Sequence, residues 1–476
     1  MNDLLGGYET VIGLEVHVQL ATRSKLFSAA PVGHGGEPNT RVVAIDLGLP
    51  GVLPAPNAAA IRLAVQAALA LEGEVQATSR FARKHYFYPD LPKGYQISQY
   101  EAPFCRGGRV PLGDGRFAAL ERIHLEEDAG KLQHTPQGSL VDYNRAGVPL
   151  IEIVGQPDLR TPEDAHRFLT NLRQILRYAG VSECDMEQGS LRCDANISLR
   201  PAQTTALGTK VEIKNLNSFK MVQRALEYER HRQAALLSAG GRVAAETRQW
   251  NDEAGETLPL RSKEQAPDYR YFPDPDLPPL RIDAGWLAQA RAALPELPAA
   301  RRARFLAEFA LPAYDADVLL AERQVADYFE AVARDCGDAK SASNWVMGEV
   351  LRLLAESGQD RRGFPVPPAE LAALLRALQQ GRVSHAAAKK VFAQMAATGT
   401  GTEAALAGTG LEQIRDAGSL EPVVRRVLLA NPKAVADYRA GKQKALDSLK
   451  GLVMRETKGK ADPQLVHALL LQCMPA

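Results

Sequence analysis

Residues 9–20 read ETVIGLEVHVQL, and this stretch determines how the first half of the chain folds. Its apolar and polar residues alternate, which is typical of a β-strand with one buried face and one polar face. Side chains two apart on a strand lie side by side, so Glu15 and His17 can reach a common point above the sheet. That point suits a bound cation or proton transfer. The same alternation is also the ordinary sequence of a half-buried strand whose polar face is merely hydrated.

The length and composition are those of an ordinary globular protein with several domains. At 476 residues the chain is too long for one core, and about two to four domains are expected. The formal net charge of +1 requires any nucleic-acid-binding surface to be local. Five cysteines without CxxC spacing argue against a disulfide framework or structural zinc. There is no signal-peptide pattern and no apolar run of about 20 residues, so a cytoplasmic protein without membrane contact is expected.

The sequence patterns predict three domains. Residues 1–293 consist mainly of short alternating runs separated by Gly and Pro, with two helical patterns between them. Strands outnumber helices there and no regular βαβ alternation occurs, so we expect an α+β fold with a large, mainly antiparallel sheet. Residues 294–400 have the apolar spacing of helices and predict an all-α domain. After a stretch of low hydrophobicity, residues 401–476 predict a small all-α tail.

The tail is locally basic. Between Lys433 and Lys460 eight lysines and arginines stand against three acids. A small helical module with clustered cations can contact a phosphate backbone. Lysines also commonly cover the solvated face of an Ala/Leu-rich helix, and the tail alone favours neither interpretation. The candidate contacts are Lys442, Lys444, Lys450, Lys458 and Lys460.

Two later segments supply carboxylates that could join Glu15 and His17. Residues 122–131 read RIHLEEDAGK, in which strand alternation puts Glu127 on the apolar face of the strand. A carboxylate that points inward needs a cation or hydrogen-bond donors to compensate its charge. In residues 149–154, PLIEIV, Glu152 is surrounded by apolar neighbours. A buried ion pair with a nearby arginine, Arg122 or Arg145, is the alternative for both acids.

Together, Glu15, His17, Glu127 and Glu152 would form a cation site with mostly oxygen ligands, which suits Mg²⁺ and therefore a nucleotide phosphate. Histidine is not the usual magnesium ligand, so His17 would bind a softer ion, hold a metal-bound water or act as a base. A shift of one residue in strand register would exchange Glu126 for Glu127.

Basic and aromatic residues alternate in residues 83–95, RKHYFYPDLPKGY. Lys84 and Lys93 could neutralise phosphates while a tyrosine such as Tyr88 stacks on a base. A Pro-rich loop with aromatic anchors explains the same pattern equally well. The chain has no P-loop, Rossmann, GxSxG or HExxH motif, so any nucleotide binding lies outside those patterns.

These segments resemble one family, the B subunit of the bacterial tRNA-dependent amidotransferase. The similarity extends over essentially the whole chain and rests on long, irregular and therefore specific strings. They are YETVIGLEVHVQL (8–20), YFYPD (86–90), HLEEDAGK (124–131), GSLRCDAN (189–196), EIKNLNS (212–218), DYRYFP (268–273) and KGKADP (458–463).

The resemblance implies a cradle-shaped catalytic domain, a helical domain and a tail that binds the tRNA body. The cradle would use ATP and Mg²⁺ to phosphorylate the side-chain carboxylate of Glu-tRNA(Gln), and also of Asp-tRNA(Asn), and ammonia would then displace phosphate to give the amide. Two partner chains are implied, an amidase (glutaminase) that would supply the ammonia from glutamine and a small third chain that would complete the heterotrimer. A non-discriminating aminoacyl-tRNA synthetase is a further expected partner.

By the same resemblance, Glu15, His17, Glu127 and Glu152 are the expected metal-site residues. Glu127, with Glu126 as its alternative, is also expected to orient or deprotonate incoming ammonium. Lys84, with Tyr88 and Lys93 as weaker candidates, is expected to hold phosphate or the aminoacyl end. A second hypothesis makes this chain a tRNA-binding scaffold without catalytic residues. A scaffold would tolerate loss of Glu15 or Glu127 and would lose tRNA affinity when the tail is changed.

Overall fold

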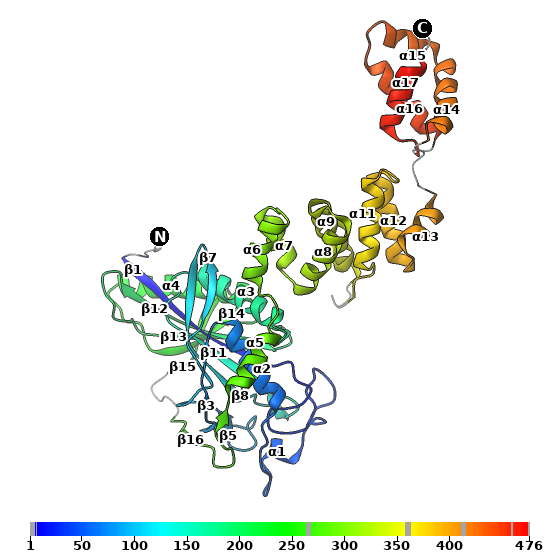
Figure 1. The fold of residues 1–476 in the computed structure, drawn as a ribbon. Coiled ribbons are helices and arrows are strands. Elements are labelled where there is room, and N and C mark those ends of the chain that lie inside the picture. Colours follow the sequence, from blue (N-terminus) through cyan, green and yellow to red (C-terminus); the bar gives the residue numbers. More distant parts are fainter. Residues whose placement is uncertain are drawn as a thin grey trace. The chain divides into compact units, whose positions relative to one another are not determined.

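The computed structural model describes residues 5, 7–262, 268–357, 363–410, 416–457 and 460–474. The chain divides into two compact units, residues 1–298 and 299–476, which Figure 1 draws in blue to green and in green to red. Among its described residues, the first unit contains the strands and five helices, which are α1 (Ala44–Leu47), α2 (Ala58–Ala70), α3 (Pro162–Tyr178), α4 (Phe219–Ser238) and α5 (Ala284–Ala293). The expected α+β class is confirmed.

The first unit is organised around strand β1, which residues 9–20 predicted. The strands are β1 (Tyr8–Gln19), β2 (Glu74–Val75), β3 (Thr78–Ser79), β4 (Ala82–His85), β5 (Tyr95–Ser98), β6 (Cys105–Arg106), β7 (Arg109–Gly113), β8 (Arg116–Glu127), β9 (Lys131–Thr135), β10 (Gly138–Asp142), β11 (Pro149–Gly155), β12 (Leu191–Pro201), β13 (Val211–Lys214), β14 (Glu246–Asn251), β15 (Glu256–Ser262), β16 (Phe272–Pro273) and β17 (Leu280–Arg281). The large sheet has the order β15-β14-β13-β12-β1-β11-β8-β6-β2, with β7 also paired to β8. Within it only β13 and β14 run parallel among the described pairs, so the sheet is mainly antiparallel.

One face of this sheet is the core of the first unit. Ile12, Leu14, Val16 and Val18 of β1 are buried, and they belong to one apolar cluster with residues of β8, β11 and β12 and of helices α2, α3, α4 and α5. The helices begin where the sequence provides caps. For example, the Thr161 side chain accepts a hydrogen bond from the Asp164 amide, and Pro162 occupies the first turn of α3. Because the helices occupy the apolar face, the polar face of β1 is left for the site.

A small sheet of order β16-β4-β5 lies beside β8. The hydroxyl of Ser98 in β5 donates to the Glu126 carboxylate of β8 at 3.2 Å, and the amide of Ile97 donates to Glu127 at 2.9 Å. The segments around residues 83–95 and 268–273, far apart in the sequence, meet here because Phe272 pairs with Arg83. The small sheet therefore carries the basic and aromatic segments to the end of β8.

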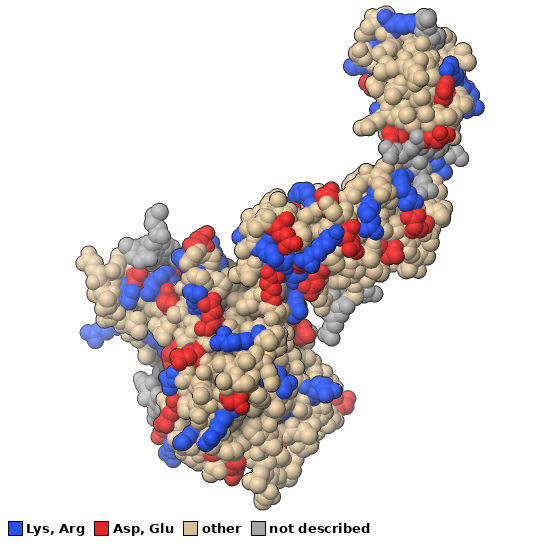
Figure 2. Space-filling view, in the orientation of Figure 1, with Lys and Arg blue, Asp and Glu red and all other residues tan. Residues whose placement is uncertain are grey.

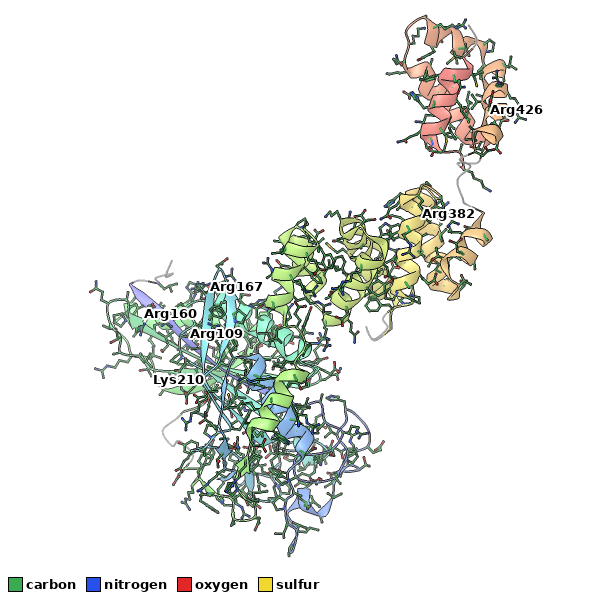
Figure 3. All side chains as sticks on the ribbon, viewed as in Figure 1. Arg109, Arg160, Arg167, Lys210, Arg382 and Arg426 are labelled. Carbon is green, nitrogen blue, oxygen red and sulfur yellow. The ribbon has the colours of Figure 1, made fainter. Side chains whose placement is uncertain are left out.

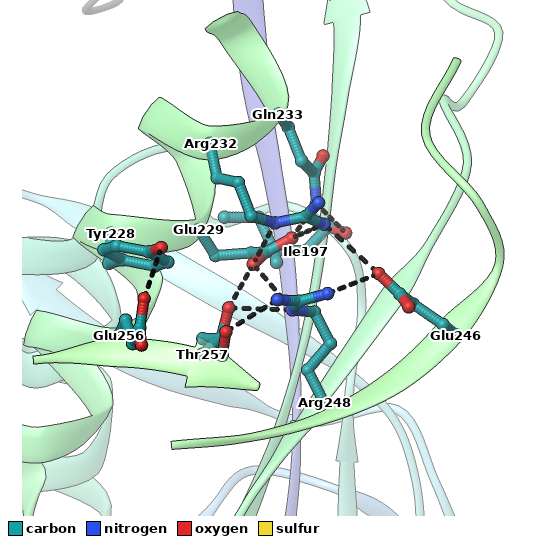
Figure 4. Close-up of polar contacts among 9 residues, drawn as sticks. All are labelled: Ile197, Tyr228, Glu229, Arg232, Gln233, Glu246, Arg248, Glu256 and Thr257. Atoms are coloured by element: carbon teal, nitrogen blue, oxygen red, sulfur yellow. Dashed lines mark hydrogen bonds and ion pairs between the residues drawn. The ribbon is translucent and has the colours of Figure 1, made fainter. Parts of the chain in front are cut away.

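Farther along the sheet, α4 packs over β12 and β15 through a buried polar network (Figure 4). Glu229 is fully buried and accepts hydrogen bonds from Arg232, Gln233 and Thr257. Arg248 of β14 lies 3.6 Å from the same carboxylate and also pairs with Glu246. Because one carboxylate satisfies several buried donors, this network fastens the helix to the edge of the sheet.

The second unit consists of helices. They are α6 (Pro298–Glu308), α7 (Ala313–Leu320), α8 (Arg323–Cys336), α9 (Ala339–Trp345), the π-helix η1 (Val346–Val350), α10 (Leu351–Ser357), α11 (Pro368–Gln379), α12 (His385–Thr398), α13 (Thr402–Thr409), α14 (Ala417–Ala430), α15 (Pro432–Arg439), α16 (Lys444–Glu456) and α17 (Pro463–Cys473). Helices α14–α17 share an apolar cluster of their own, built around Leu420, Val424, Leu449, Val453 and Val466. Among the described helices, none combines the length and apolarity needed to cross a bilayer.

Candidate functional site

The polar face of the large sheet gathers a cluster of two histidines and two carboxylates. His17 of β1 lies opposite Glu152 of β11, and Glu152 lies opposite His124 of β8. Glu126 is two residues beyond His124 on β8, so its side chain emerges on the same face. Three neighbouring strands thus place four titratable side chains over one small area of the sheet, and Glu126 and His124 are almost completely buried there.

Three of these residues form a candidate cation site, namely His17, Glu126 and Glu152. Their ligand atoms all lie within 4.8 Å of one another. His17 Nε2 is 3.6 Å from a carboxylate oxygen of each acid, which is too long for a good hydrogen bond. With metal–oxygen distances of about 2.1 Å, neighbouring ligands of an octahedral Mg²⁺ stand about 3 Å apart and opposite ones about 4.2 Å apart. The spacing and the donor set therefore fit a divalent cation held by two carboxylates and one imidazole.

His124 lies beneath this cluster and compensates its negative charge. Its Nε2 is 3.1 Å from Glu152 and 3.6 Å from Glu126. Burial by itself would lower the pKa of His124, but the interactions with Glu126 and Glu152 raise the pKa to about 9. Burial likewise would raise the pKa of both acids. The partner His124, together with the charge of His17, instead holds the pKa of Glu126 and of Glu152 below the ordinary glutamate range. Both carboxylates are therefore ionised at neutral pH.

An arginine borders the cluster on the β12 side. Arg192 lies opposite His17, and its guanidinium donates to the buried Asp128 at 2.8 Å. Asp128 also accepts from Gln19 at 3.0 Å, so the end of β8 is tied to β1 and β12. Burial would lower the pKa of Arg192, but the charges of Asp128 and Glu126 raise it. Arg192 is thus a fixed cation beside the cluster, where an anionic substrate group can be bound.

Glu15 is on the predicted face but one step away from the cluster. It lies opposite Asp194, and one of its oxygens accepts from the side-chain amide of Asn196 at 3.0 Å. Lys214 of β13 pairs with Asp194 at 2.6 Å, which continues the polar face toward the sheet edge. Glu15 therefore lies beside the three residues that converge, two positions along β1 from His17.

Glu127 is not brought together with His17 and Glu152. It follows the alternation of Ile123 and Leu125, so its side chain emerges on the opposite face of β8, where it is buried. There it accepts from the amide of Ile97 and forms a close ion pair with Lys93. The sequence placed Glu127 correctly on the apolar face. The candidate cation site is on the other face of the strand, so no register shift is needed to bring Glu126 into it.

Lys84 and the aromatic segment approach the cluster from the small sheet. The low pKa of Glu152 is due mainly to His124 and His17, and the charge of Lys84 lowers it further. Lys84 Nζ also lies 4.9 Å from the centre of the Tyr269 ring. Tyr88, in contrast, is exposed and packs against Tyr86 with ring centres 5.7 Å apart. The charge of Lys84 therefore acts on the cluster, whereas Tyr88 lies among surface rings.

Several residues of the site were missed from the sequence. His124 could have been identified from the sequence, because His124 and Glu126 have the same two-residue spacing as Glu15 and His17. Arg192 could also have been identified, because residues 191–199 alternate apolar and polar residues as β1 does, which puts Arg192 on a polar face.

On the face that Figure 2 shows, charges of both signs are mixed. Lys and Arg are interspersed with Asp and Glu over the visible face (Figure 2). Each of the five arginines labelled in Figure 3 has an acidic partner, and the pairs are Arg109–Glu72, Arg160–Glu9, Arg167–Asp114, Arg382–Glu403 and Arg426–Glu456. The surface is therefore consistent with the small net charge of the chain.

The predicted tail lysines lie at and around α16. Lys442 and Lys444 are exposed at its start, and Lys442 pairs with Asp437 at 2.9 Å. Lys450 and Lys460 are half-buried. Lys458 lies outside the described residues. Their role in binding a phosphate backbone stays a prediction.

Known protein families and relatives match nearly the whole chain. Residues 10–288 match the family described as GatB/GatE catalytic domain, and residues 327–474 match the one described as GatB domain. The B subunit of the aspartyl/glutamyl-tRNA(Asn/Gln) amidotransferase of Carboxydothermus hydrogenoformans is 51% identical over 472 residues, covering 97% of this chain and 98% of the relative. The proteins of the same name from Moorella thermoacetica and Bacillus thuringiensis are 52% and 49% identical, covering 97% and 98% of this chain and 99% and 98% of their own. The chain therefore belongs to the family of aspartyl/glutamyl-tRNA(Asn/Gln) amidotransferase B subunits.

Proposed function

We propose that this chain carries the amide-forming site of a tRNA-dependent amidotransferase. The site phosphorylates the side-chain carboxylate of Glu-tRNA(Gln), and of Asp-tRNA(Asn), with ATP, and ammonia then displaces the phosphate. The observation that carries the proposal is the convergence of His17, Glu126 and Glu152, together with two cations whose charges interact with those carboxylates, Lys84 and Arg192. Phosphoryl transfer to a carboxylate brings anions together, so such a reaction needs this arrangement of charge.

The cluster His17, Glu126 and Glu152 would hold Mg²⁺, with Glu15 as the next carboxylate along β1. Bound there, Mg²⁺ supplies neutralisation of the phosphate oxygens of ATP. His124 keeps Glu126 and Glu152 in place and ionised, because its imidazolium contacts both carboxylates. His17 acts as a ligand in this arrangement, since its Nε2 faces both acids at the same distance.

The two cations, Lys84 and Arg192, would bind different anionic groups of the substrates. Lys84 approaches Glu152 from the small sheet and would hold a phosphate of ATP. Arg192 lies on the opposite side, across from His17, and would hold the side-chain carboxylate of the aminoacyl group. This placement orients the carboxylate toward the phosphate, which is most of what a phosphoryl-transfer site has to do.

Glu127 would act on ammonia rather than on the cation. Ammonium must lose a proton before its nitrogen can attack, and a buried carboxylate on its route to the site can take that proton. Glu127 is adjacent to Glu126 in the chain, but its carboxylate lies on the other side of β8, in contact with Lys93. Ammonium that arrives from that side would meet Glu127 first, lose a proton to its carboxylate and continue to the cation cluster as ammonia.

The remaining parts of the chain would serve the complex. Because this chain shows no pattern for a glutaminase nucleophile, the ammonia would come from an amidase chain. A small third chain would join both. A non-discriminating aminoacyl-tRNA synthetase would deliver the substrate in the cytoplasm. Helices α14–α17 have a core of their own, which supports a separate tail domain at residues 401–476 after a helical domain at 294–400. The tail lysines would contact the tRNA backbone.

The function is tested with the complex of this chain and its amidase and small partner chains. Supplying Glu-tRNA(Gln), ATP, Mg²⁺ and ammonium chloride without glutamine bypasses the amidase. We expect Gln-tRNA and ADP to form together. Glu127→Gln should lower kcat/KM for ammonium by about 100-fold, the typical contribution of a general base, and raising the pH should restore much of the rate because free ammonia becomes abundant.

The matched control is Glu121→Gln, since Glu121 lies on the same strand with its side chain half exposed. This control should behave as wild type. If Glu127→Gln retains the wild-type ammonium dependence, Glu127 only anchors Lys93 and the proposed proton transfer is wrong. The scaffold hypothesis predicts normal turnover in every variant of the cluster and loss of tRNA affinity when Lys442 and Lys444 are replaced.

A further inference from the structure

A small cavity lies beside the cation cluster, in the small sheet. Its volume is about 190 Å³, and its lining includes Arg80, Phe81, Tyr100, Glu101, Tyr271 and Phe272. These residues come from the two segments that β4 and β16 bring together and from the turn after β5. The cavity is smaller than the roughly 300–1,000 Å³ of sites for drug-sized ligands. It suits one flat ring system rather than a whole nucleotide.

The wall of the cavity is a pair of stacked aromatic rings. The rings of Tyr100 and Tyr271 are 4.2 Å apart between centres and only 8° from parallel. Tyr269 meets Tyr271 edge-on at 6.0 Å, while Tyr100 is 52% exposed. An exposed ring at the end of an existing stack is a surface on which another flat ring can continue the stack.

Polar groups at the rim match the edge of a purine. Adenine presents an amino group that donates and ring nitrogens that accept. The carboxylate of Glu101 is an acceptor and the guanidinium of Arg80 is a donor, and both residues are exposed at the cavity. Aromatic stacking together with one donor and one acceptor is sufficient to hold a base in a defined orientation.

The cavity and the cation cluster are neighbours. The Ser98 hydroxyl donates to Glu126 at 3.2 Å, and Tyr100 is two residues farther along the chain. Tyr271 stacks on Tyr100 with ring centres 4.2 Å apart, and burial together with the charges of Glu126 and Glu152 raises the pKa of its hydroxyl. A ligand whose base lies against Tyr100 therefore has its other end close to the cluster.

We propose that the cavity beside Tyr100 and Tyr271 binds the adenine base of a substrate whose reacting end lies at the cation cluster. This inference rests on the proposed function, which supplies two sources of the same chemistry. One is ATP, whose phosphates would point to the cluster. The other is the 3′-terminal adenosine of the aminoacyl-tRNA, which bears the carboxylate to be phosphorylated.

The test uses the complete complex in the ammonium-supported reaction, with Tyr100→Ala and Tyr100→Phe compared with wild type. Loss of one base–aromatic stack should raise the KM of one substrate by about 5- to 100-fold in Tyr100→Ala. Tyr100→Phe retains the ring and should restore the wild-type KM. Phe117→Ala removes a similarly exposed ring elsewhere in the first unit, 47% exposed, and is the matched control.

A rise in the KM for ATP alone assigns the cavity to ATP, and a rise for the tRNA alone assigns it to the terminal adenosine. Unchanged KM values for both substrates overturn the proposal. If the wild-type complex makes no Gln-tRNA, the proposed function fails instead. The same variants are then compared by equilibrium binding of ATP and of tRNA, in which a weaker affinity supports the cavity and equal affinities overturn it.

Discussion

Replacing Glu152 with Gln should reduce ammonium-supported formation of Gln-tRNA at least about 100-fold, while tRNA affinity stays within about twofold of wild type. Glutamine has nearly the same shape, so the variant removes one negative charge and little else. Glu152 lies 3.6 Å from His17, a residue of the candidate cation site, and 3.1 Å from His124, which compensates the charge of that site. It therefore interacts with both.

The size of the effect follows from the small number of anions in the cluster. Glu126 and Glu152 are its two carboxylates, and without Glu152 the imidazolium of His124 cancels the one that is left. A divalent cation would then bind a site with almost no net negative charge. The rate is measured with saturating Mg²⁺ and again with a tenfold excess, because partial rescue by excess Mg²⁺ is expected of a weakened cation site.

Glu121→Gln on the neighbouring strand β8 is the control, since it removes an exposed carboxylate from the same sheet. It should leave the rate unchanged. A Glu152→Gln complex that turns over at the wild-type rate would show that the cluster is structural. That result would favour the scaffold hypothesis.

The largest effect on stability is expected from Glu229→Ala. Glu229 is fully buried in α4 and accepts from Arg232, Gln233 and Thr257, with Arg248 at 3.6 Å (Figure 4). Removing one partner of a buried ion pair leaves the others desolvated and unpaired. We therefore expect the free energy of unfolding of the first unit to fall by about 3–5 kcal/mol.

The measurement is urea-induced unfolding followed by tryptophan fluorescence, because Trp250 belongs to β14 beside this network. The matched control is Glu227→Ala on the same helix, whose carboxylate is 40% exposed and pairs with Arg230 and His231. Exposed pairs of this kind contribute about 0–1 kcal/mol. Equal stability of the two variants would mean that the buried network contributes no more than a surface pair.

The fold followed from local patterns in the sequence, as β1 illustrates. Alternation over residues 9–20 predicted a strand with Ile12, Leu14, Val16 and Val18 buried, and these residues are buried. The pairs Glu15 with Asp194 and His17 with Glu152 depend on strand order and register, which one strand does not contain. The α+β fold could therefore be predicted from the sequence. The cross-strand neighbours of each polar residue could not.

The site shows the same limit at Glu126 and Glu127. Alternation assigned the two acids to opposite faces correctly, yet it does not say which face holds ligands and which holds the core. That follows only from where α2, α3 and α4 pack. The cavity beside Tyr271 depends on contacts between segments nearly 200 residues apart, for example Arg83 with Asp274, and no local pattern predicts such a contact.

The proposed function depends most on a divalent cation site formed by His17, Glu126 and Glu152. This site is tested most directly by titration of the complex with Mn²⁺, observed by electron paramagnetic resonance in the absence of ATP and tRNA. Mn²⁺ prefers the same oxygen and imidazole ligands and reports binding without turnover. We expect one Mn²⁺ site in wild type that is lost or weakened at least about tenfold in Glu126→Gln and is unchanged in Glu121→Gln. Equal stoichiometry and affinity in wild type and Glu126→Gln would contradict the assignment of these residues as cation ligands.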